Sequence, residues 1–182
     1  MTPWYIATET FGPTRGDAWT DYIAWSGLTQ LEELVTLDSM LCPSALPEIG
    51  DDHWPHVIVV GERGFGTPVF LDLSILLEAV AEVPDRRILR VAREPDADPE
   101  PDPAWPAFEF LGYDLVDYAG TASPLSNCGG FPDVFANDEL SPLGLLTSRA
   151  RAFAIRDDLR RLHPENPHAD CRVWAISRLV ER

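Results

Sequence analysis

The sequence contains no lysine: all 14 of its basic residues are arginine, set against 30 aspartate and glutamate residues. A Walker-type phosphate loop, a kinase-type ATP site, a Schiff-base enzyme and a pyridoxal phosphate enzyme each use a lysine in their usual form. These classes are therefore excluded, and we expect no cofactor. Together with abundant alanine, proline, glycine and aspartate, the missing lysine is typical of a GC-rich bacterial genome.

Cysteine and long apolar runs are also scarce. Cys42, Cys128 and Cys171 are odd in number, far apart and without a CxxC pair, which argues against a disulfide framework and a four-cysteine zinc site. No stretch approaches 18 apolar residues, and no basic leader precedes an apolar run at the N-terminus. We therefore expect a cytoplasmic protein with reduced thiols and no membrane contact.

The formal net charge is -16. A surface this negative repels the phosphate backbone, so nucleic acid is not an expected partner, although the last segment, residues 149–182, is net basic. The same charge attracts basic proteins, which are the partner class we expect.

The length of 182 residues suits one domain with a real core. Apolar periodicity predicts a single α+β domain, with a mixed or antiparallel sheet and about three helices packed on it. Strands are expected at 4–8, 56–60, 88–92, 108–116 and 171–180, with a further candidate at 19–25. Helices are expected to begin at the capping residues Thr29, Asp72 and Ser148.

Residues 94–106 alternate acidic residues with proline. This composition favours an extended, hydrated polyproline II segment. Because the chain on either side is short for an independent domain, we interpret the segment as an excursion within one domain spanning residues 1–182.

Cys128 is the candidate nucleophile. It lies in a glycine-containing loop after an expected strand, where backbone amides can stabilise a thiolate or an oxyanion. A nucleophile needs a base, and His168 is the fallback choice among the four histidines, although no local signature identifies it. A small Cys-dependent hydrolase or transferase is thus the alternative function, and a purely structural loop is the other interpretation.

His163, His168 and Cys171 form the candidate metal cluster, because imidazole and thiolate are zinc ligands and a loop can fold them around one ion. A helix end, a proline-rich turn and a buried cysteine explain the same residues without a metal. We therefore expect no metal.

Acidic residues cluster at Glu32 and Glu33, and at Asp51 and Asp52 beside Trp54. An aromatic anchor ringed by carboxylates suits a protein-binding surface, since the ring supplies buried area and the charges steer a basic partner. Core tryptophans and solubilising acids are the other interpretation.

The leading hypothesis is a non-enzymatic interaction protein that covers a basic partner with this acidic surface. In being small, acidic and free of catalytic motifs, the chain is similar to bacterial immunity proteins that inhibit toxins. This likeness is one of composition, because no residue motif carries it.

Overall fold

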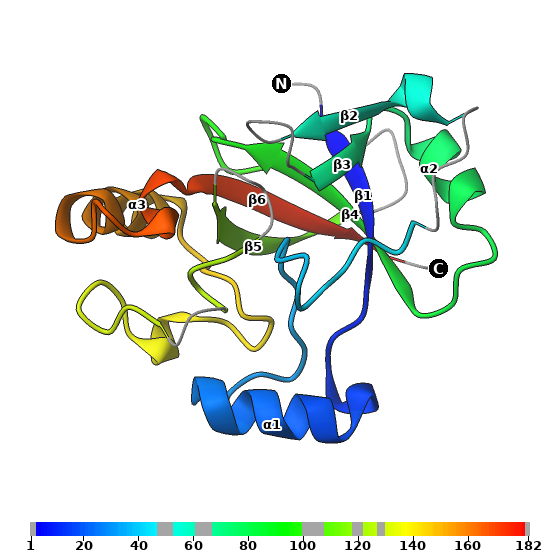
Figure 1. The fold of residues 1–182 in the computed structure, drawn as a ribbon. Coiled ribbons are helices and arrows are strands. Elements are labelled where there is room, and N and C mark those ends of the chain that lie inside the picture. Colours follow the sequence, from blue (N-terminus) through cyan, green and yellow to red (C-terminus); the bar gives the residue numbers. More distant parts are fainter. Residues whose placement is uncertain are drawn as a thin grey trace.

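Six antiparallel strands form one sheet in the order β2-β3-β1-β4-β6-β5 (Figure 1). The computed structural model describes residues 3–46, 53–60, 67–99, 108–117, 122–126 and 130–180. The strands are β1 (Trp4–Glu9), β2 (Val57–Val60), β3 (Thr67–Phe70), β4 (Arg86–Arg93), β5 (Phe108–Val116) and β6 (Arg172–Leu179). The predicted α+β class is confirmed, and of the two sheet types expected the structure has the antiparallel one.

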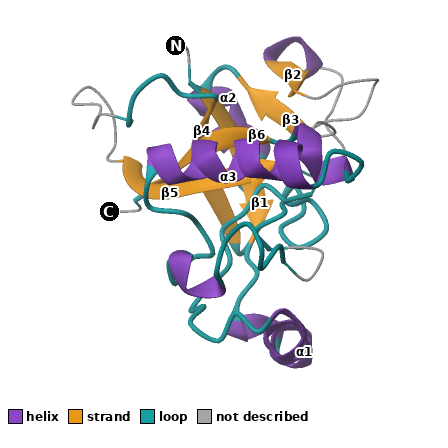
Figure 2. Cartoon of the chain, turned by 90° about the vertical axis from the view of Figure 1, so that its left-hand side faces the viewer, coloured by secondary structure: helices purple, strands orange, loops and turns teal. Residues whose placement is uncertain are grey.

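Three α-helices accompany the sheet: α1 (Asp17–Ser26), α2 (Leu73–Ala79) and α3 (Arg149–Leu162). The predicted N-caps of α2 and α3 are confirmed, since the side chains of Asp72 and Ser148 accept hydrogen bonds from the backbone of their own first turns. Figures 1 and 2 place α2 and α3 beside the sheet, and α1 apart from it beyond a layer of loops.

The segment 19–25, a candidate strand by sequence, is helical and belongs to α1. Trp19 and Tyr22 are buried three residues apart, which is helical spacing. Glycines bracket the helix, and Gly27 ends it in the left-handed conformation with φ 69°. Aromatic content suggested a strand, but the glycines and the three-residue spacing determine the structure.

The helix predicted to begin at Thr29 is wrong, because no residue from 27 to 46 is helical. This segment takes its hydrogen bonds from distant parts of the chain instead. The backbone N–H of Leu34 donates to the carbonyl of Phe11 at 2.9 Å, and that of Val35 donates to Leu143 at 3.0 Å. Five consecutive residues, 34–38, are buried, which a surface helix with one apolar stripe does not allow.

β3 was not predicted, and its Pro68 explains why, since proline lowers the expectation of a strand. Only Tyr5 and Phe70 are in register between β1 and β3. The next β3 position that would bond to β1 is Pro68, which has no N–H to donate. The carbonyl of Ala7 accepts from the backbone N–H of Ala45 instead, at 2.9 Å, so residues 43–45 replace β3 along this part of β1.

A buried carboxylate, Asp114 of β5, joins three segments of the chain. Its side chain accepts hydrogen bonds from the Thr36 hydroxyl at 2.8 Å, the Leu37 N–H at 2.9 Å and the Ser123 hydroxyl at 2.6 Å. The backbone N–H of Leu115 donates to the same carboxylate at 2.8 Å. Desolvation nevertheless raises the pKa of Asp114 to about 6, against the lowering effect of these bonds.

The segment 140–146 caps the outer edge of β5. Tyr113 and Leu146 exchange both backbone hydrogen bonds, at 2.8 and 3.0 Å. Gly112 makes this close approach feasible at a bulge, because it has φ 147° and a Cβ there would lie 2.7 Å from the Leu146 carbonyl oxygen. The end of the sheet at β5 is therefore covered by chain.

The acidic excursion predicted at 94–106 is described only in its first part, residues 94–99. Glu94 continues from β4, donating its backbone N–H to the carbonyl of Val173 at 2.7 Å, and the carbonyl of Pro95 accepts from Arg149 at 3.1 Å. Residues 100–106 lie outside the described residues, so the extended character of the segment stays a prediction.

Candidate functional site

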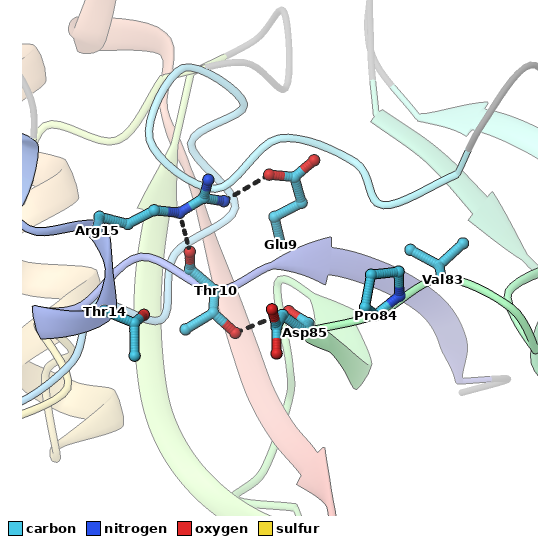
Figure 3. Close-up of a pocket in the computed structure, with 7 residues that line it drawn as sticks. All are labelled: Glu9, Thr10, Thr14, Arg15, Val83, Pro84 and Asp85. Carbon is cyan, nitrogen blue, oxygen red and sulfur yellow. Dashed lines mark hydrogen bonds and ion pairs between the residues drawn. The ribbon is translucent and has the colours of Figure 1, made fainter.

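A pocket of about 330 Å3 opens where β1 ends, between the short turn Pro13–Arg15 and the loop that enters β4 (Figure 3). Polar groups line most of it, and two apolar residues complete the wall. The lining residues are Glu9, Thr10, Thr14, Arg15, Val83, Pro84 and Asp85.

The shape of the pocket is held mainly by hydrogen bonds to backbone carbonyls. Thr10 donates its N–H and its hydroxyl to the carbonyl of Asp85, at 3.2 and 2.8 Å. Arg15 donates from Nε to the carbonyl of Thr10 at 2.9 Å, and from Nη2 to the carboxylate of Glu9 at 2.5 Å. Asp85 sits at φ 50°, an uncommon conformation that these two bonds from Thr10 help to hold.

The chemistry of the pocket suits binding of a cation. Two carboxylates, those of Glu9 and Asp85, and one guanidinium, that of Arg15, line it, and the guanidinium is paired with Glu9 (Figure 3). Neither a histidine nor a cysteine lines it, and the Thr10 hydroxyl donates to a carbonyl, so no nucleophile is paired there with a base. Glu9 already holds the guanidinium group of Arg15, and an arginine side chain of a partner carries the same group.

The acidic face of α1, defined here as Asp17, Asp21 and Trp25, begins directly after the pocket. These residues recur every four positions and are all solvent-exposed, and the Trp25 side chain is 57% exposed. The opposite side of the helix anchors it, with Trp19 and Tyr22 buried in the core. The ring of Trp25 lies 6.1 Å from that of Tyr22, so the buried tyrosine packs against part of the exposed indole.

Most arginines in the described part of the chain are engaged within the molecule. The ones that lie within ion-pair distance of a carboxylate are Arg15, Arg87, Arg149, Arg151, Arg156, Arg160, Arg161 and Arg178. Two more, Arg90 and Arg93, lie over the rings of Phe108 and Trp4. The excess negative charge is therefore presented by carboxylates such as those of α1.

The acidic surface predicted by sequence is only partly brought together. Glu32 is exposed, but Glu33 is half-buried and forms ion pairs with Arg87 and Arg178, on central strands of the sheet. Trp54 is 49% exposed and precedes β2, at the end of the sheet. Asp51 and Asp52 lie outside the described residues.

The histidines and the cysteine of the candidate metal cluster make packing and hydrogen-bonding contacts in the structure. Nε2 of His163 lies 2.8 Å from the carboxylate of Asp133, and the ring of Phe131 packs edge-on to both His163 and His168. Cys171 is fully buried where β6 begins. Within the ranges that the structure describes, no group of three His, Cys, Asp or Glu residues is placed to hold a metal ion.

The catalytic pair Cys128 and His168 stays a prediction, because Cys128 lies outside the described residues. His168 is buried, and desolvation lowers its pKa below the usual value. A base of this kind stays neutral at physiological pH.

The other two thiols are unsuited to nucleophilic chemistry. Cys42 and Cys171 are both buried, and desolvation raises the pKa of each to about 12. In native protein at pH 8 we expect a disulfide reagent such as DTNB to modify both at least about 100-fold more slowly than in denatured protein. Mass spectrometry then identifies any fast-reacting thiol; fast modification of Cys42 would contradict the burial, and fast modification at Cys128 alone would favour the enzyme alternative.

The sequence did not identify the acidic face of α1 or the pocket. A signal for the first was present, since Asp17, Asp21 and Trp25 share a face once 17–26 is taken as helical. The pocket depends on a contact between residues 10 and 85, which no local pattern predicts.

Comparison with known proteins adds no further constraint: the chain matches no family model, no curated protein and no solved structure. None of the helices described here is both long and apolar enough to cross a membrane.

Proposed function

We propose that the chain is a non-enzymatic interaction protein that binds a basic protein partner through the acidic face of α1 and the adjoining pocket. The observation that carries this proposal is the placement of an exposed tryptophan in line with Asp17 and Asp21, on a helix that follows Arg15, whose guanidinium is already paired with Glu9. Tryptophan is enriched among residues that dominate binding energy, and surrounding charges steer the encounter.

An inhibitor of the immunity type is one form that this function takes. Inhibition requires only that the bound surface cover a basic active site, and an acidic helix face reaches such a site without chemistry of its own. The pocket extends this surface, because its Glu9 and Asp85 carboxylates lie where the chain enters α1.

The test begins with affinity capture of the tagged protein from its native host at low and high salt, followed by affinity measurements on the purified partner. Trp25→Ala is expected to weaken binding about tenfold or more, because it removes an anchor of the contact. Asp17→Asn combined with Asp21→Asn is expected to lower the association rate and its salt dependence.

The control is Glu165→Gln combined with Asp170→Asn, which removes the same charge from exposed positions outside α1. If the control weakens binding as much as the α1 variants do, the surface assignment is wrong and only the net charge matters. If no partner is captured at either salt concentration, the interaction proposal fails and the Cys128 alternative becomes the better one.

A further inference from the structure

The strand β2 forms an open end of the sheet. Within the described residues it pairs only with β3, whereas the opposite end, at β5, is capped by Leu146 (Figure 1). The β2 sequence is Val57-Ile58-Val59-Val60. Ile58 is 37% and Val59 52% exposed, and as neighbours in a strand their side chains point to opposite faces. Such an apolar edge is a template for pairing with another strand.

The register shows which backbone groups face outward. Residues of an antiparallel pair alternate between bonding to their partner and facing away from it. The N–H of Leu71 donates to the carbonyl of His56 at 3.3 Å, so the bonded positions of β2 are Ile58 and Val60. The N–H and C=O groups of Val59 and the C=O group of Val57 therefore face the open edge. The N–H of Val57 donates to the carbonyl of Trp54, in the turn before the strand.

Pro68 is consistent with this assignment. It stands opposite Val59, at a position where β3 donates no N–H to β2. The proline therefore removes no hydrogen bond from the β2–β3 pair. The edge thus offers three backbone groups, the C=O of Val57 and the N–H and C=O of Val59, at the spacing of a β-ladder.

Charge indicates what pairs with this edge. In the stretch that follows β3, from Leu71 to Asp85, the chain has acidic residues at 72, 78, 82 and 85 and no basic residue. All four acidic residues are exposed. A second copy of the chain, itself at net charge -16, is repelled, whereas an extended segment that contains arginine or lysine is attracted.

We propose that β2 takes an extended, basic segment of a partner protein as a seventh strand, bonded to the backbone of Val57 and Val59. The apolar side chains of this segment would pack on Ile58 and Val59, and its basic side chains would be attracted by the net negative charge of the chain. The segment belongs to the partner inferred under the proposed function, on which this inference rests, but β2 is a separate contact from α1.

The probe is a capped ten-residue peptide of alternating valine and lysine. Its control carries the same side chains but has an N-methyl group on every backbone nitrogen, so it keeps the charge and has no N–H on either edge with which to extend a sheet. In the free protein we expect the amide protons of Ile58 and Val60 to exchange slowly with solvent and that of Val59 to exchange fast. The unmodified peptide should slow exchange at Val59 at least about tenfold by NMR, and the methylated peptide should not.

Val59→Pro is the matched variant, because it removes an outward-facing N–H and no hydrogen bond to β3. It should fold normally and bind the peptide at least about tenfold more weakly. Val59→Thr keeps the N–H and the branched shape, and the amide at position 59 should still be protected on peptide binding.

Equal binding of the methylated peptide, or unchanged exchange at Val59, would overturn the inference. So would a dimer in sedimentation that Val59→Pro dissociates, because the occupant would then be a second copy. The α1 variant Trp25→Ala separates the two proposals: it should lose partner affinity while the peptide still protects the amide of Val59.

Discussion

Replacing Asp114 with alanine is expected to lower the free energy of unfolding by about 3–5 kcal/mol, measured by urea denaturation at pH 7. The side chain is fully buried and accepts four hydrogen bonds, from Thr36, Leu37, Leu115 and Ser123. Alanine leaves two backbone N–H groups without an acceptor in a place that water does not reach. The variant also releases the segments around residues 36 and 123 from β5.

The same carboxylate makes stability depend on pH. Burial raises the pKa of Asp114 from an ordinary 3.8 to about 6, so the folded state binds this proton more tightly than the unfolded state does. Between these two values the free energy of unfolding falls as the pH rises, by roughly 3 kcal/mol in total for this one group. The stability from protonated Asp114 is thus fully present below pH 3.8 and is lost as the pH rises through about 6.

Asp114→Asn isolates this contribution, because an amide of the same shape does not titrate. The variant is expected to be less stable than the native protein at low pH, since its amide nitrogen faces donors. Between pH 4.5 and 7 its unfolding free energy should fall less steeply with pH than that of the native protein. The difference in slope should correspond to at most one bound proton. Parallel curves for the two proteins would show that Asp114 keeps an ordinary pKa. The window stays above the range where Glu139, with a pKa lowered to about 2 by Arg151, loses its stabilising charge.

The secondary structure that the sequence predicts well is the part fixed by local signals. The strands β4, β5 and β6 and the helices α2 and α3 were all expected, the helices from Asp72 and Ser148 as caps and from their apolar stripes. Each of these signals acts over a few residues and needs no knowledge of what the element packs against.

The segment 27–46 could not be predicted in the same way. A capping box after Thr29 and leucines at helical spacing favour a helix locally, but Leu34 and Val35 donate their backbone N–H groups to Phe11 and Leu143. Tertiary hydrogen bonds and burial outweigh a helix propensity of a few tenths of a kcal/mol per residue. Asp114 was missed for a related reason, since its partners are up to 78 residues away in the chain.

The predicted functional surface depended on adjacency in sequence, which the fold does not preserve. Glu33 sits next to Glu32 in the chain, yet it points to Arg87 and Arg178 while Glu32 is exposed. The composition shows that the protein is acidic, but it does not show which carboxylates remain unpaired, because this depends on where each arginine lies. Only the tertiary structure gives these positions, and it moves the candidate surface from Glu33 to α1.

Gly112→Ala is expected to destabilise the protein by about 3 kcal/mol or more, because two costs coincide at this position. The glycine has φ 147°, which a residue with a side chain rarely adopts, and a Cβ would meet the Leu146 carbonyl oxygen at 2.7 Å and the Leu145 side chain at 2.9 Å. Both neighbours are buried and belong to the segment that caps β5, so neither moves without disturbing the core.

Gly12→Ala is the matched control. Its φ is -169° and the nearest atom to an added Cβ lies 3.8 Å away, so the change should alter the unfolding free energy by less than about 1 kcal/mol. Hydrogen exchange at the amides of Tyr113 and Leu146 locates the effect, since these two residues bond to each other across the capped edge. Faster exchange there in Gly112→Ala, with unchanged exchange in Gly12→Ala, would tie the loss of stability to the cap. A Gly112→Ala protein as stable as the control would contradict this prediction. It would mean that the segment 140–146 can withdraw from β5 at little cost, which would leave a second open edge at the end of the sheet opposite β2.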